Sequence, residues 1–474
     1  MNVTRRSFGC KVAAAAASVA LGDSRAQGAM QFPDVLVLVP GIMGSVLRRN
    51  GGTVWGLDLQ ALLNALRSGG LDLRNLRTEA ASSTAQAVEA TALFETTTLI
   101  PGFWKVDGYT EARNWLVQQL ALTPGSNYFD APYDWRMDNR RSAASIAARC
   151  REWLGAWREK SKNGQARLVF VCHSMGGLVV QHACEVLGLH SSTRAVFTLG
   201  TPFQGSYISL ARLVNGFVSE GLTKTVASFD SVYQLLPTYA CIDAGMGMQT
   251  IAEVGDRLAD KLDLKRYLSV GKDFHDQMHS ATKANQGKSD NVLWHRTQSS
   301  THRTATSGIW SPQGLSSQEL WRGQPALGDG TVPGYNLAAP RVASKGMAQM
   351  HCNQLHGAIQ NYEPALRNIV DTLKTGLLSG TKSSGDPVSL SFDDYLPSGG
   401  PLRVRLRFEK PVGNSAALLI DRVDRKTDQS RRPLEGLPTQ QDFELTTVLR
   451  DPGVYRVSVE VRGDVLCSDL ACVL

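Results

Sequence analysis

A buried strand that runs into a sharp turn of small residues is the feature that most restricts the fold of this chain. Residues 168–171 are apolar and are followed by Cys172-His173-Ser174-Met175-Gly176-Gly177, after which apolar residues recur with helical spacing. An apolar run bounded by a turn is typical of a parallel strand that is covered on both faces. The sequence therefore predicts a strand, a tight turn with Ser174 at its apex, and a helix.

Such a strand, turn and helix form the nucleophile elbow of the α/β-hydrolase fold, which exposes a serine hydroxyl above the sheet. The elbow needs small residues around the serine, because larger side chains would collide with the neighbouring strand and helix. Gly176 meets this need, whereas Cys172 stands where glycine is usual, so the G-x-S-x-G pattern is only partly met. The alternative is an ordinary βα turn with a surface serine. We predict the elbow, and a serine acyl-transfer enzyme.

The N-terminus has the order of features of an export signal. Thr4-Arg5-Arg6-Ser7-Phe8 is a twin-arginine pattern, and it is followed by an apolar stretch at residues 12–21 and by Ser24-Arg25-Ala26. The small residues at 24–26 resemble a cleavage site. The alternative is a basic start to a buried, alanine-rich helix. We predict a signal peptide over residues 1–26 and export to the periplasm or the extracellular space.

Charge and cysteine content exclude several classes of function. The chain has 474 residues and a formal net charge of +7, which falls to +4 without the leader, too little and too dispersed to indicate nucleic-acid binding. The apolar stretch of the leader is shorter than the roughly 20 residues that cross a bilayer. Cysteines and histidines lack metal-ligand spacing, so we expect no metal and no cofactor. Cys467 and Cys472 are interpreted as a local pair around a short turn, and Cys150, Cys172 and Cys184 as buried apolar residues.

Two domains follow the leader in this interpretation. Apolar runs at residues 34–41 and 195–200 predict further buried strands, so residues 30–380 are expected to form an α/β domain. Regular alternation of strands and helices is lost at about 46–100 and 207–325, which predicts a large cap over the site. A helix near 363–378 closes this domain, and residues 381–387 are expected to be a linker.

Period-two alternation replaces the α/β pattern after the linker. Apolar residues alternate with polar ones at 388–392, 402–408 and 455–461, between turns rich in proline and glycine. Residues 388–474 are therefore predicted to form a small antiparallel β-sandwich domain. It carries no catalytic constellation, so we expect a structural or surface-binding role.

A serine nucleophile needs a base and an acid that orients the base. In α/β-hydrolases these follow the serine in the order acid, then histidine. Asp329 in Gly328-Asp329-Gly330 is the predicted acid, although glycine and aspartate also favour plain turns. His356, before Gly357-Ala358 and a helix, is the predicted base. His351 is the alternative, within a segment that resembles a strand.

The oxyanion of the tetrahedral intermediate requires preorganised backbone donors. The elbow supplies the N–H of Met175, the residue after the nucleophile. The second donor is expected from the glycine-bearing loop after the first strand, and we assign it to Ile42.

Several motifs, in this order, resemble the lecithin:cholesterol acyltransferase family, which includes lysosomal phospholipase A2-like enzymes. The resemblance covers about residues 34–378 and not the C-terminal domain. The motifs are Val39-Pro40-Gly41-x-x-Gly44-Ser45, Ala131-Pro132-Tyr133-Asp134-Trp135-Arg136, His173-Ser174-Met175-Gly176, Thr201-Pro202 and Gly328-Asp329-Gly330-Thr331-Val332-Pro333.

The resemblance implies an enzyme that moves a fatty acyl group from a phospholipid or similar ester, through an acyl-serine, to an alcohol or water. It assigns Ser174, Asp329 and His356 as the triad, and Ile42 and Met175 as oxyanion donors. The cysteines that the family pairs early in the cap are missing here. Contact of Trp55 or Phe103-Trp104 with a lipid surface stays a weaker hypothesis, because single tryptophans are mostly core residues.

Three functions remain open from the sequence. The first is a lipid acyl ester hydrolase or O-acyltransferase, and the second is a lipase or esterase that acts on neutral esters with water alone. Choice of acceptor depends on how the cap excludes water, which the sequence does not reveal. The third is a catalytically silent binding protein, against which the order Ser174, Asp329, His356 argues.

Overall fold

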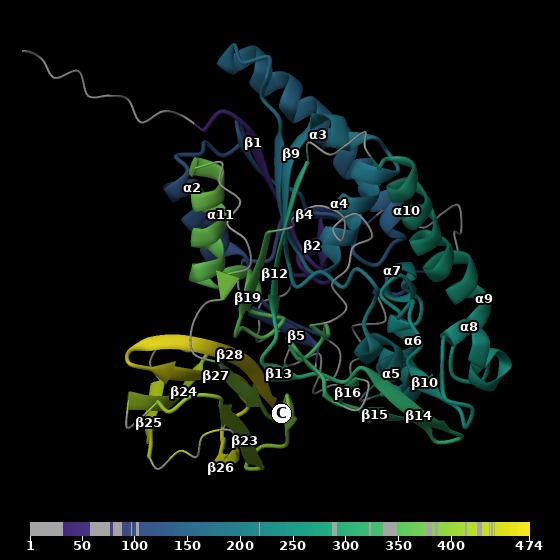
Figure 1. Cartoon of the computed structure of the whole chain (residues 1–474), viewed down its shortest axis with the longest axis vertical. Helices are drawn as coiled ribbons and strands as arrows, with labels where there is room; N and C mark the ends of the chain where they lie inside the picture. The colour runs from purple at the N-terminus through teal and green to yellow at the C-terminus, as the bar shows by residue number, and fades with distance from the viewer. Residues whose placement is uncertain are drawn as a thin grey trace, which may run out of the picture. The chain divides into compact units, whose positions relative to one another are not determined.

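A seven-stranded parallel sheet forms the centre of the molecule in the computed structural model (Figure 1). The structure describes residues 32–474 with gaps at 57–75, 79–87, 96, 101–103, 218, 287–291, 322–323, 335–347, 376–381, 384–386, 413–414, 424–428, 436, 438 and 440. The predicted signal peptide, residues 1–26, lies outside the described residues.

The order of strands in the sheet creates a switch point beside the predicted elbow. Every recorded pair is parallel. The strands occur in the order β20, β19, β12, β9, β8, β1, β7. Chain order therefore reverses between β1 and β8, and ligands of open α/β sheets bind in the crevice at such a point. The strands are β1 (Val35–Val39), β7 (Tyr128–Asp130), β8 (Leu168–His173), β9 (Thr193–Leu199), β12 (Leu293–Ser299), β19 (Ala348–Cys352) and β20 (Lys382–Ser383).

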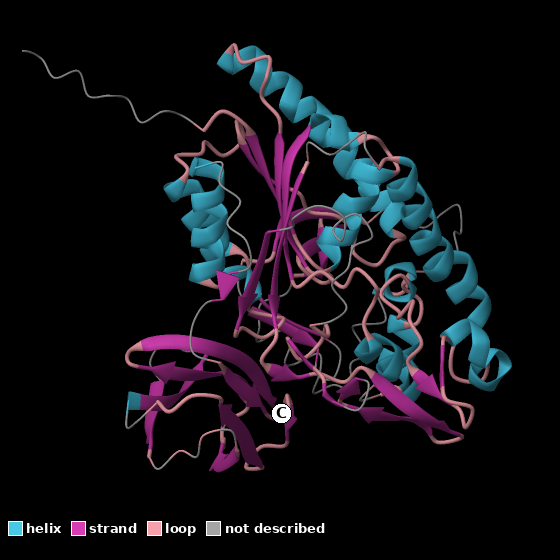
Figure 2. Ribbon diagram, in the orientation of Figure 1, coloured by secondary structure: helices cyan, strands magenta, loops and turns pink. Residues whose placement is uncertain are grey.

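Helices cover both faces of the sheet, as Figure 2 shows for the helical and strand layers. In Figure 1, α2 (Thr110–Gln119) and α11 (Glu363–Thr375) lie on one side, and α3 (Asn139–Ser161), α4 (Met175–Glu185) and α10 (Asp273–Ala284) on the other. This double cover explains the apolar runs, because all residues of β1 and β8 are buried. The predicted α/β class, with a parallel sheet, is confirmed.

The strand β12 corrects the predicted extent of the cap. Residues 207–325 were expected to be cap, but β12 lies between β9 and β19 in the central sheet. Its sequence, Leu-Trp-His-Arg-Thr-Gln-Ser, buries five polar side chains in a row, so it has no apolar run to reveal it. The prediction of a linker over residues 381–387 is corrected as well. This range contains β20, an edge strand of the central sheet in which Lys382 pairs with Met350.

Short elements fill the remaining insertions. A four-stranded sheet in the order β11, β10, β14, β15 and several short helices occupy much of the range between β9 and β19. They are α5 (Tyr207–Asn215), α6 (Glu220–Val226), α7 (Asp230–Tyr233), β10 (Ile242–Asp243), β11 (Met248–Gln249), α8 (Ile251–Val254), η3 (Gly255–Leu258), α9 (Leu264–Arg266), η4 (Tyr267–Lys272), β13 (His302–Arg303), β14 (Ser307–Ser311), β15 (Gly314–Gln318), β16 (Leu320–Trp321), β17 (Gln324–Pro325) and β18 (Leu327–Gly328). Elsewhere lie β2 (Ser45–Arg49), β3 (Gly52–Trp55), β4 (Glu89–Leu93), β5 (Thr97–Ile100), β6 (Trp104–Asp107), η2 (Leu189–Ser192) and η5 (Ile359–Asn361).

Two mainly antiparallel sheets follow residue 387. One has the order β21, β23, β26 and the other β22, β28, β27, β24, β25, and both contribute to one hydrophobic cluster. Along β23 buried and exposed residues alternate, as period-two patterning predicts. The strands are β21 (Val388–Ser391), β22 (Tyr395–Leu396), β23 (Pro401–Phe408), β24 (Ala416–Arg422), β25 (Gln429–Leu434), β26 (Asp442–Val448), β27 (Gly453–Val461) and β28 (Asp464–Val473).

The interpretation of Cys467 and Cys472 as a pair is wrong. Both are free and lie on the single strand β28, where one belongs to the large cluster of the C-terminal sheets and the other to a separate small cluster. Five residues of strand span about 16 Å, whereas a disulfide needs Cα atoms within about 7 Å.

Among the described residues, no helix is long and apolar enough to cross a membrane.

The carboxylate of Asp34 connects the N-terminal ends of three central strands, β1, β8 and β9. Its Oδ1 accepts the N–H of Arg167 at 2.8 Å, just before β8, and its carboxylate forms an ion pair with Arg194 on β9. Asp34 itself is buried. Removing it would leave a backbone donor at the edge of the core without its acceptor.

We predict that Asp34→Ala lowers the free energy of unfolding by about 1–3 kcal/mol, because the Arg167 N–H loses its acceptor. Asp34→Asn keeps an oxygen for that N–H and should lose less. Urea unfolding followed by circular dichroism measures both. If the alanine variant is as stable as the asparagine variant, the proposed role of this hydrogen bond is wrong.

Candidate active site

The backbone at Ser174 adopts the strained turn that an elbow requires. Strand β8 ends at His173 and helix α4 begins at Met175, with Ser174 between them at φ 51° and ψ −125°. A positive φ is costly for a residue with a side chain and is concentrated at functional sites. The turn is held from outside, because Thr201 Oγ1 donates to the carbonyl oxygen of Ser174 at 2.9 Å.

The glycines after Ser174 are required by close backbone packing. A Cβ atom at Gly176 would lie 2.4 Å from the carbonyl oxygen of Pro40, and one at Gly177 would lie 2.1 Å from Thr201 Oγ1. Both distances are far below van der Waals contact. Gly176 thus brings the start of α4 against the loop that follows β1, and Gly177 brings it against Thr201, which follows β9.

Three side chains form a chain of hydrogen bonds that starts at this turn. His356 Nε2 lies 2.8 Å from Ser174 Oγ, and His356 Nδ1 lies 2.7 Å from Asp329 Oδ2. All three side chains are buried, and Ser174 has no exposed surface. Residues 174, 329 and 356 are therefore brought together in the geometry of a nucleophile, its base and the acid that orients the base.

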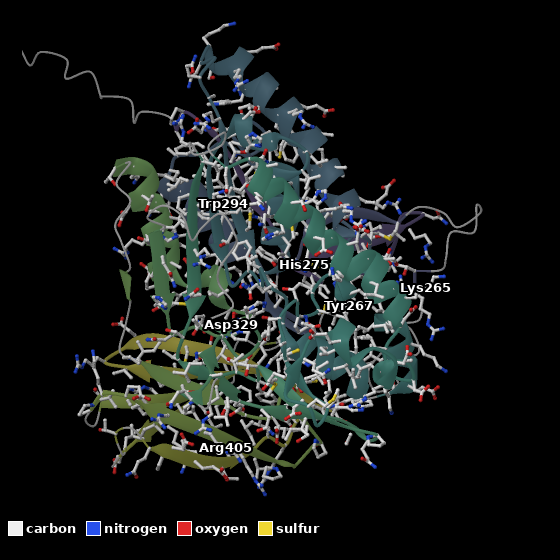
Figure 3. All side chains as sticks on the ribbon, turned by 45° about the vertical axis from the view of Figure 1, so that its right-hand side comes forward. Lys265, Tyr267, His275, Trp294, Asp329 and Arg405 are labelled. Atoms are coloured by element: carbon white, nitrogen blue, oxygen red, sulfur yellow. The ribbon has the colours of Figure 1, made fainter. Side chains whose placement is uncertain are left out.

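A turn fixes the orientation of the Asp329 carboxylate. Its Oδ1 accepts the N–H groups of Thr331 at 2.9 Å and Val332 at 2.6 Å, which leaves Oδ2 directed at the imidazole. The carbonyl oxygen of Asp329 also accepts the N–H of His356 at 3.0 Å. In Figure 3, the labelled Asp329 lies where the central strands approach the C-terminal sheets.

The alternative base, His351, lies inside strand β19. Its ring nitrogens lie 3.5 Å from Gln298 Nε2 and 3.0 Å from Gln349 Nε2. Its backbone pairs with Gln298 and Ser383 on the flanking strands. His356 instead lies in the loop after β19, and it is His356 that contacts Ser174 and Asp329.

The loop after β1 packs directly on the turn at Ser174. A Cβ atom at Gly41 would lie 2.9 Å from Ser174 Cβ, so this position must remain glycine for the loop to approach so closely. Ile42 follows Gly41 and is buried. Met175 is the first residue of α4, where the N–H has no partner within the helix. Both predicted oxyanion donors thus belong to the two segments that meet at the serine.

A second hydrogen-bonded chain, which the sequence did not reveal, connects these segments to the base. The N–H of Gly41 donates to Tyr109 Oη at 2.8 Å, and Tyr109 Oη lies 2.8 Å from His173 Nδ1. His173 Nε2 lies 3.0 Å from the carbonyl oxygen of His356. Because a carbonyl only accepts, Nε2 carries the proton of His173 and Nδ1 accepts the hydroxyl of Tyr109. Tyr109 belongs to no recognisable motif and meets His173 only in the folded chain.

Burial keeps His173 neutral. Burial is the larger cause and the nearby His356 the second, and together they lower the pKa of this imidazole to about 3. A neutral ring with one donor and one acceptor matches the partners that His173 has on either side. His173 thus supports the main chain of His356 and adds no charge beside it.

The structure corrects the hypothesis that Trp55 contacts a lipid surface. Trp55 is buried, its indole N–H donates to the carbonyl oxygen of Met43 at 3.0 Å, and its ring packs edge-on against Trp135. It is therefore part of the core beside the loop after β1. Phe103 lies outside the described residues, and for Trp104 only the backbone is described.

Residues 75–303 match the model of the lecithin:cholesterol acyltransferase family. The predicted resemblance is thereby confirmed over these residues, and it supports a lipid acyl ester hydrolase or acyltransferase. The matched range includes Ser174 and Met175 but ends before Asp329 and His356. A search of curated proteins gave no match.

Solved structures give only distant similarities. The lipase BlEst2 of Bacillus licheniformis, in its mature form, is 15% identical over 72% of this chain and 92% of its own, with a TM-score of 0.33. The phospholipase PlaB of Legionella pneumophila is 10% identical over 91% of this chain and 86% of its own, with a TM-score of 0.32. Similarities this weak carry no argument about this chain.

The neutrality of His173 predicts how stability depends on pH. The unfolded chain takes up a proton near the ordinary histidine pKa of 6.5, whereas folded His173, with a pKa of about 3, does not. Stability contributed by this residue is therefore lost as the pH falls from 6.5 towards 3, and at pH 5 the loss is about 2 kcal/mol. His173→Gln keeps a donor for the His356 carbonyl and does not titrate.

We expect the unfolding free energy of His173→Gln to fall less than that of the wild type between pH 7 and pH 5. Urea unfolding at both pH values measures this. His279→Gln, which replaces an exposed histidine on α10, is the control and should follow the wild type. Equal pH dependence in all three proteins would contradict a neutral, buried His173.

Proposed function

We propose that this protein is a serine-dependent lipid acyl ester hydrolase or O-acyltransferase of the α/β-hydrolase fold. The observation that carries the proposal is the continuous hydrogen-bond chain from Ser174 Oγ through His356 to Asp329, at the switch point of a parallel sheet. The family match over residues 75–303 supports a lipid ester as substrate.

In the first half-reaction, Ser174 Oγ attacks the carbonyl carbon of the ester while His356 Nε2 takes its proton. The carboxylate of Asp329 holds the Nδ1–H and stabilises the imidazolium that forms. Collapse of the tetrahedral intermediate breaks the ester C–O bond, and the imidazolium returns the proton to the leaving alcohol. The acyl group then remains on Ser174.

The second half-reaction reverses these roles. A water molecule or an alcohol attacks the acyl carbonyl, His356 takes its proton, and Ser174 Oγ leaves with a proton from the imidazolium. Water yields a free fatty acid, and an alcohol yields a new ester. In both halves, the N–H groups of Ile42 and Met175 would stabilise the oxyanion, as backbone donors do in this class of enzyme.

The surroundings of the triad favour catalysis of this kind. Ser174, His356 and Asp329 are shielded from bulk water, where preorganised dipoles and charges act more strongly than in solvent. Insertions at residues 207–325, except β12, would form the cap that recognises the acyl chain. We infer that the two C-terminal sheets form a β-sandwich domain over residues 388–474.

Export is part of the proposal as well. The twin-arginine pattern and the apolar stretch of residues 1–26 support transport of the folded protein out of the cytoplasm. Lipid esters of an envelope or of the surroundings would then be accessible to it.

We predict that Ser174→Ala abolishes release or transfer of the acyl group and leaves the fold intact, because only the nucleophilic oxygen is removed. Mature protein is incubated with vesicles of acyl-labelled phospholipid, with and without a long-chain alcohol. A fall of about 10⁴-fold or more in turnover is expected. Retained activity in the variant would contradict the mechanism.

The products decide between the remaining functions. Label on the alcohol identifies an acyltransferase, and free fatty acid alone identifies a hydrolase. Turnover of neutral esters only, such as a labelled triacylglycerol, identifies a neutral-ester lipase. Failure of a fluorophosphonate probe to label Ser174 favours a binding protein.

Two glycines offer a matched test of the contact between Asp329 and His356. Gly200 and Gly188 both have positive φ, at 65° and 71°, so alanine is similarly strained at each. A methyl at Gly200 would lie 3.1 Å from Asp329 Oδ2 and 3.2 Å from His356 Nδ1, whereas one at Gly188 meets no heavy atom within 4 Å. The two variants therefore differ mainly in what the methyl touches.

We predict that Gly200→Ala lowers turnover by up to about 100-fold, because the methyl displaces the imidazole and a misplacement of about 1 Å costs that much. Gly188→Ala should retain the activity of the wild type despite a comparable loss of stability. Ester hydrolysis and thermal unfolding are measured on both. Equal activities would contradict the expected disturbance of the Asp329–His356 contact.

A further inference from the structure

In the loop that contains His356, the residues that precede the histidine are hydrogen-bonded to the C-terminal sheets. The carbonyl oxygen of Asn353 lies 2.5 Å from His302 Nε2, and His302 Nδ1 accepts the N–H of Leu390 on β21 at 3.1 Å. His302 is buried, and burial lowers its pKa, so the ring is neutral with one donor and one acceptor. It joins the loop to β21.

Gln354 connects the same loop to strand β28. Its Oε1 accepts the N–H of Ser468 at 2.9 Å and the N–H of Leu355 at 3.0 Å. The edge of β28 that faces away from β27 pairs with the short strand β22 at Cys472 and Val473. Gln354 meets the same edge at Ser468. The side chain of Gln354 is buried, where the loss of an acceptor is costly.

Leu355 continues the connection through apolar contact. It is buried, and apart from it the buried residues of its cluster all come from the C-terminal sheets and the loops between their strands. The residue immediately before His356 thus belongs to the core of those sheets, although it lies in the α/β part of the chain.

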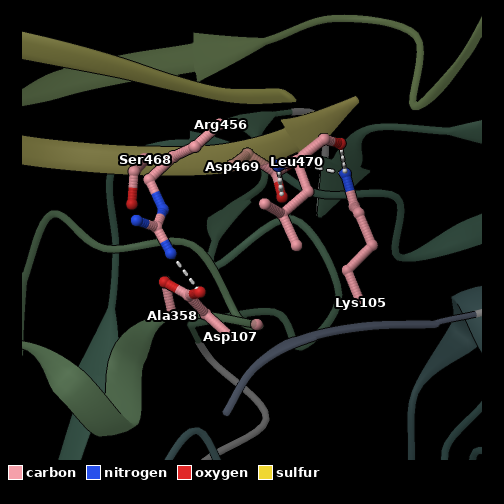
Figure 4. Close-up of a pocket in the computed structure, with 8 residues that line it drawn as sticks. Lys105, Asp107, Ala358, Arg456, Ser468, Asp469 and Leu470 are labelled. Atoms are coloured by element: carbon pink, nitrogen blue, oxygen red, sulfur yellow. Dashed lines mark hydrogen bonds and ion pairs between the residues drawn. The ribbon is translucent and has the colours of Figure 1, made fainter. Parts of the chain in front are cut away.

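Gly357, which follows His356 in the loop, is held in place through β6. The carbonyl oxygen of Gly357 accepts the N–H of Asp107 at 2.8 Å, and a Cβ atom at Gly357 would lie 2.4 Å from the carbonyl oxygen of Lys105. Asp107 forms an ion pair with Arg456 on β27, and Lys105 Nζ lies 2.6 Å from Asp469 Oδ2 on β28 (Figure 4).

We propose that the C-terminal sheets hold residues 353–357 in the conformation that presents His356 to Ser174, and that Gln354 is the positioning residue of this contact. The inference rests on the proposed function and gives the C-terminal region a part in it. His356 faces Ser174 and Asp329 with its side chain. The residues before it are bound to β21 and β28, and Gly357 after it is bound to β6, which in turn is bound to β27 and β28. Displacement of the general base by about 1 Å strongly lowers the rate of the catalysed reaction. The contacts that fix residues 353–357 therefore set the efficiency of proton transfer.

The test compares three variants of the full-length mature protein. Gln354→Leu removes the acceptor for Ser468, and Gln354→Glu keeps an oxygen at that place. Ile420→Val removes one methylene from the same hydrophobic cluster on β24, which β27 separates from β28, and so controls for lost stability. The measurements are the rate of fluorophosphonate labelling of Ser174 across pH 6–9, kcat and KM for a soluble ester, and the apparent Tm.

We expect Gln354→Leu to lower kcat and the labelling rate at least tenfold at unchanged KM. Gln354→Glu should restore most of both rates, and Ile420→Val should keep the rates of the wild type. If Gln354→Leu does not fold, Lys105→Met tests the other side of the loop, with an expected fall of about threefold in labelling rate.

Three results would overturn the inference. The first is a labelling rate of Gln354→Leu equal to that of the wild type. Where Lys105→Met replaces this variant, the same result for Lys105→Met overturns the inference. Another is a loss in Ile420→Val as large as that in Gln354→Leu, which would make the effect one of general stability. If the wild-type protein itself is not labelled, the proposed function fails and the inference fails with it, which separates this case from the other two.

Discussion

The approach of the loop after β1 to the turn at Ser174 is the constraint on which the site depends. Gly41 and Gly176 have no side chains, and a Cβ atom at either place would lie 2.9 Å or less from the opposite segment. This contact keeps the strained backbone of Ser174 in place, because a positive φ persists only where the surroundings fix it. It also brings the loop that contains Ile42 against the turn that contains Met175.

Polar groups buried around this contact are satisfied in a way that avoids extra charge. The chain from Gly41 through Tyr109 and His173 to the carbonyl of His356 has a donor facing an acceptor at each step. A protonated His173 would place a cation beside the base and lower its affinity for a proton. A neutral His173 supports the main chain of the base, and the carboxylate of Asp329 holds its ring.

The C-terminal sheets extend the same support to the residues that flank the base. Leu355 packs in their core, and Gln354 meets the edge of β28. A region that shows no catalytic residues in its sequence therefore bears on the triad through the loop between β19 and η5. Its contribution depends on contacts between residues far apart in the chain, such as Gln354 and Ser468, which are 114 positions apart, and no local pattern records such contacts.

The sequence alone determined the parallel sheet, the position of the elbow and the regions in which the acid and the base would be found. Continuous apolar runs and period-two alternation are local consequences of burial, so β1, β8 and β23 could be predicted from their residues. Strand β12 could not, because it buries His295, Arg296 and Gln298 in the sheet interior, and polar residues give no apolar signal. Tertiary structure alone decided that His356 and not His351 contacts Ser174, that Trp55 is core, and that Tyr109 joins the site. Each of these depends on side chains that meet across the fold, and sequence patterns report only neighbours along the chain.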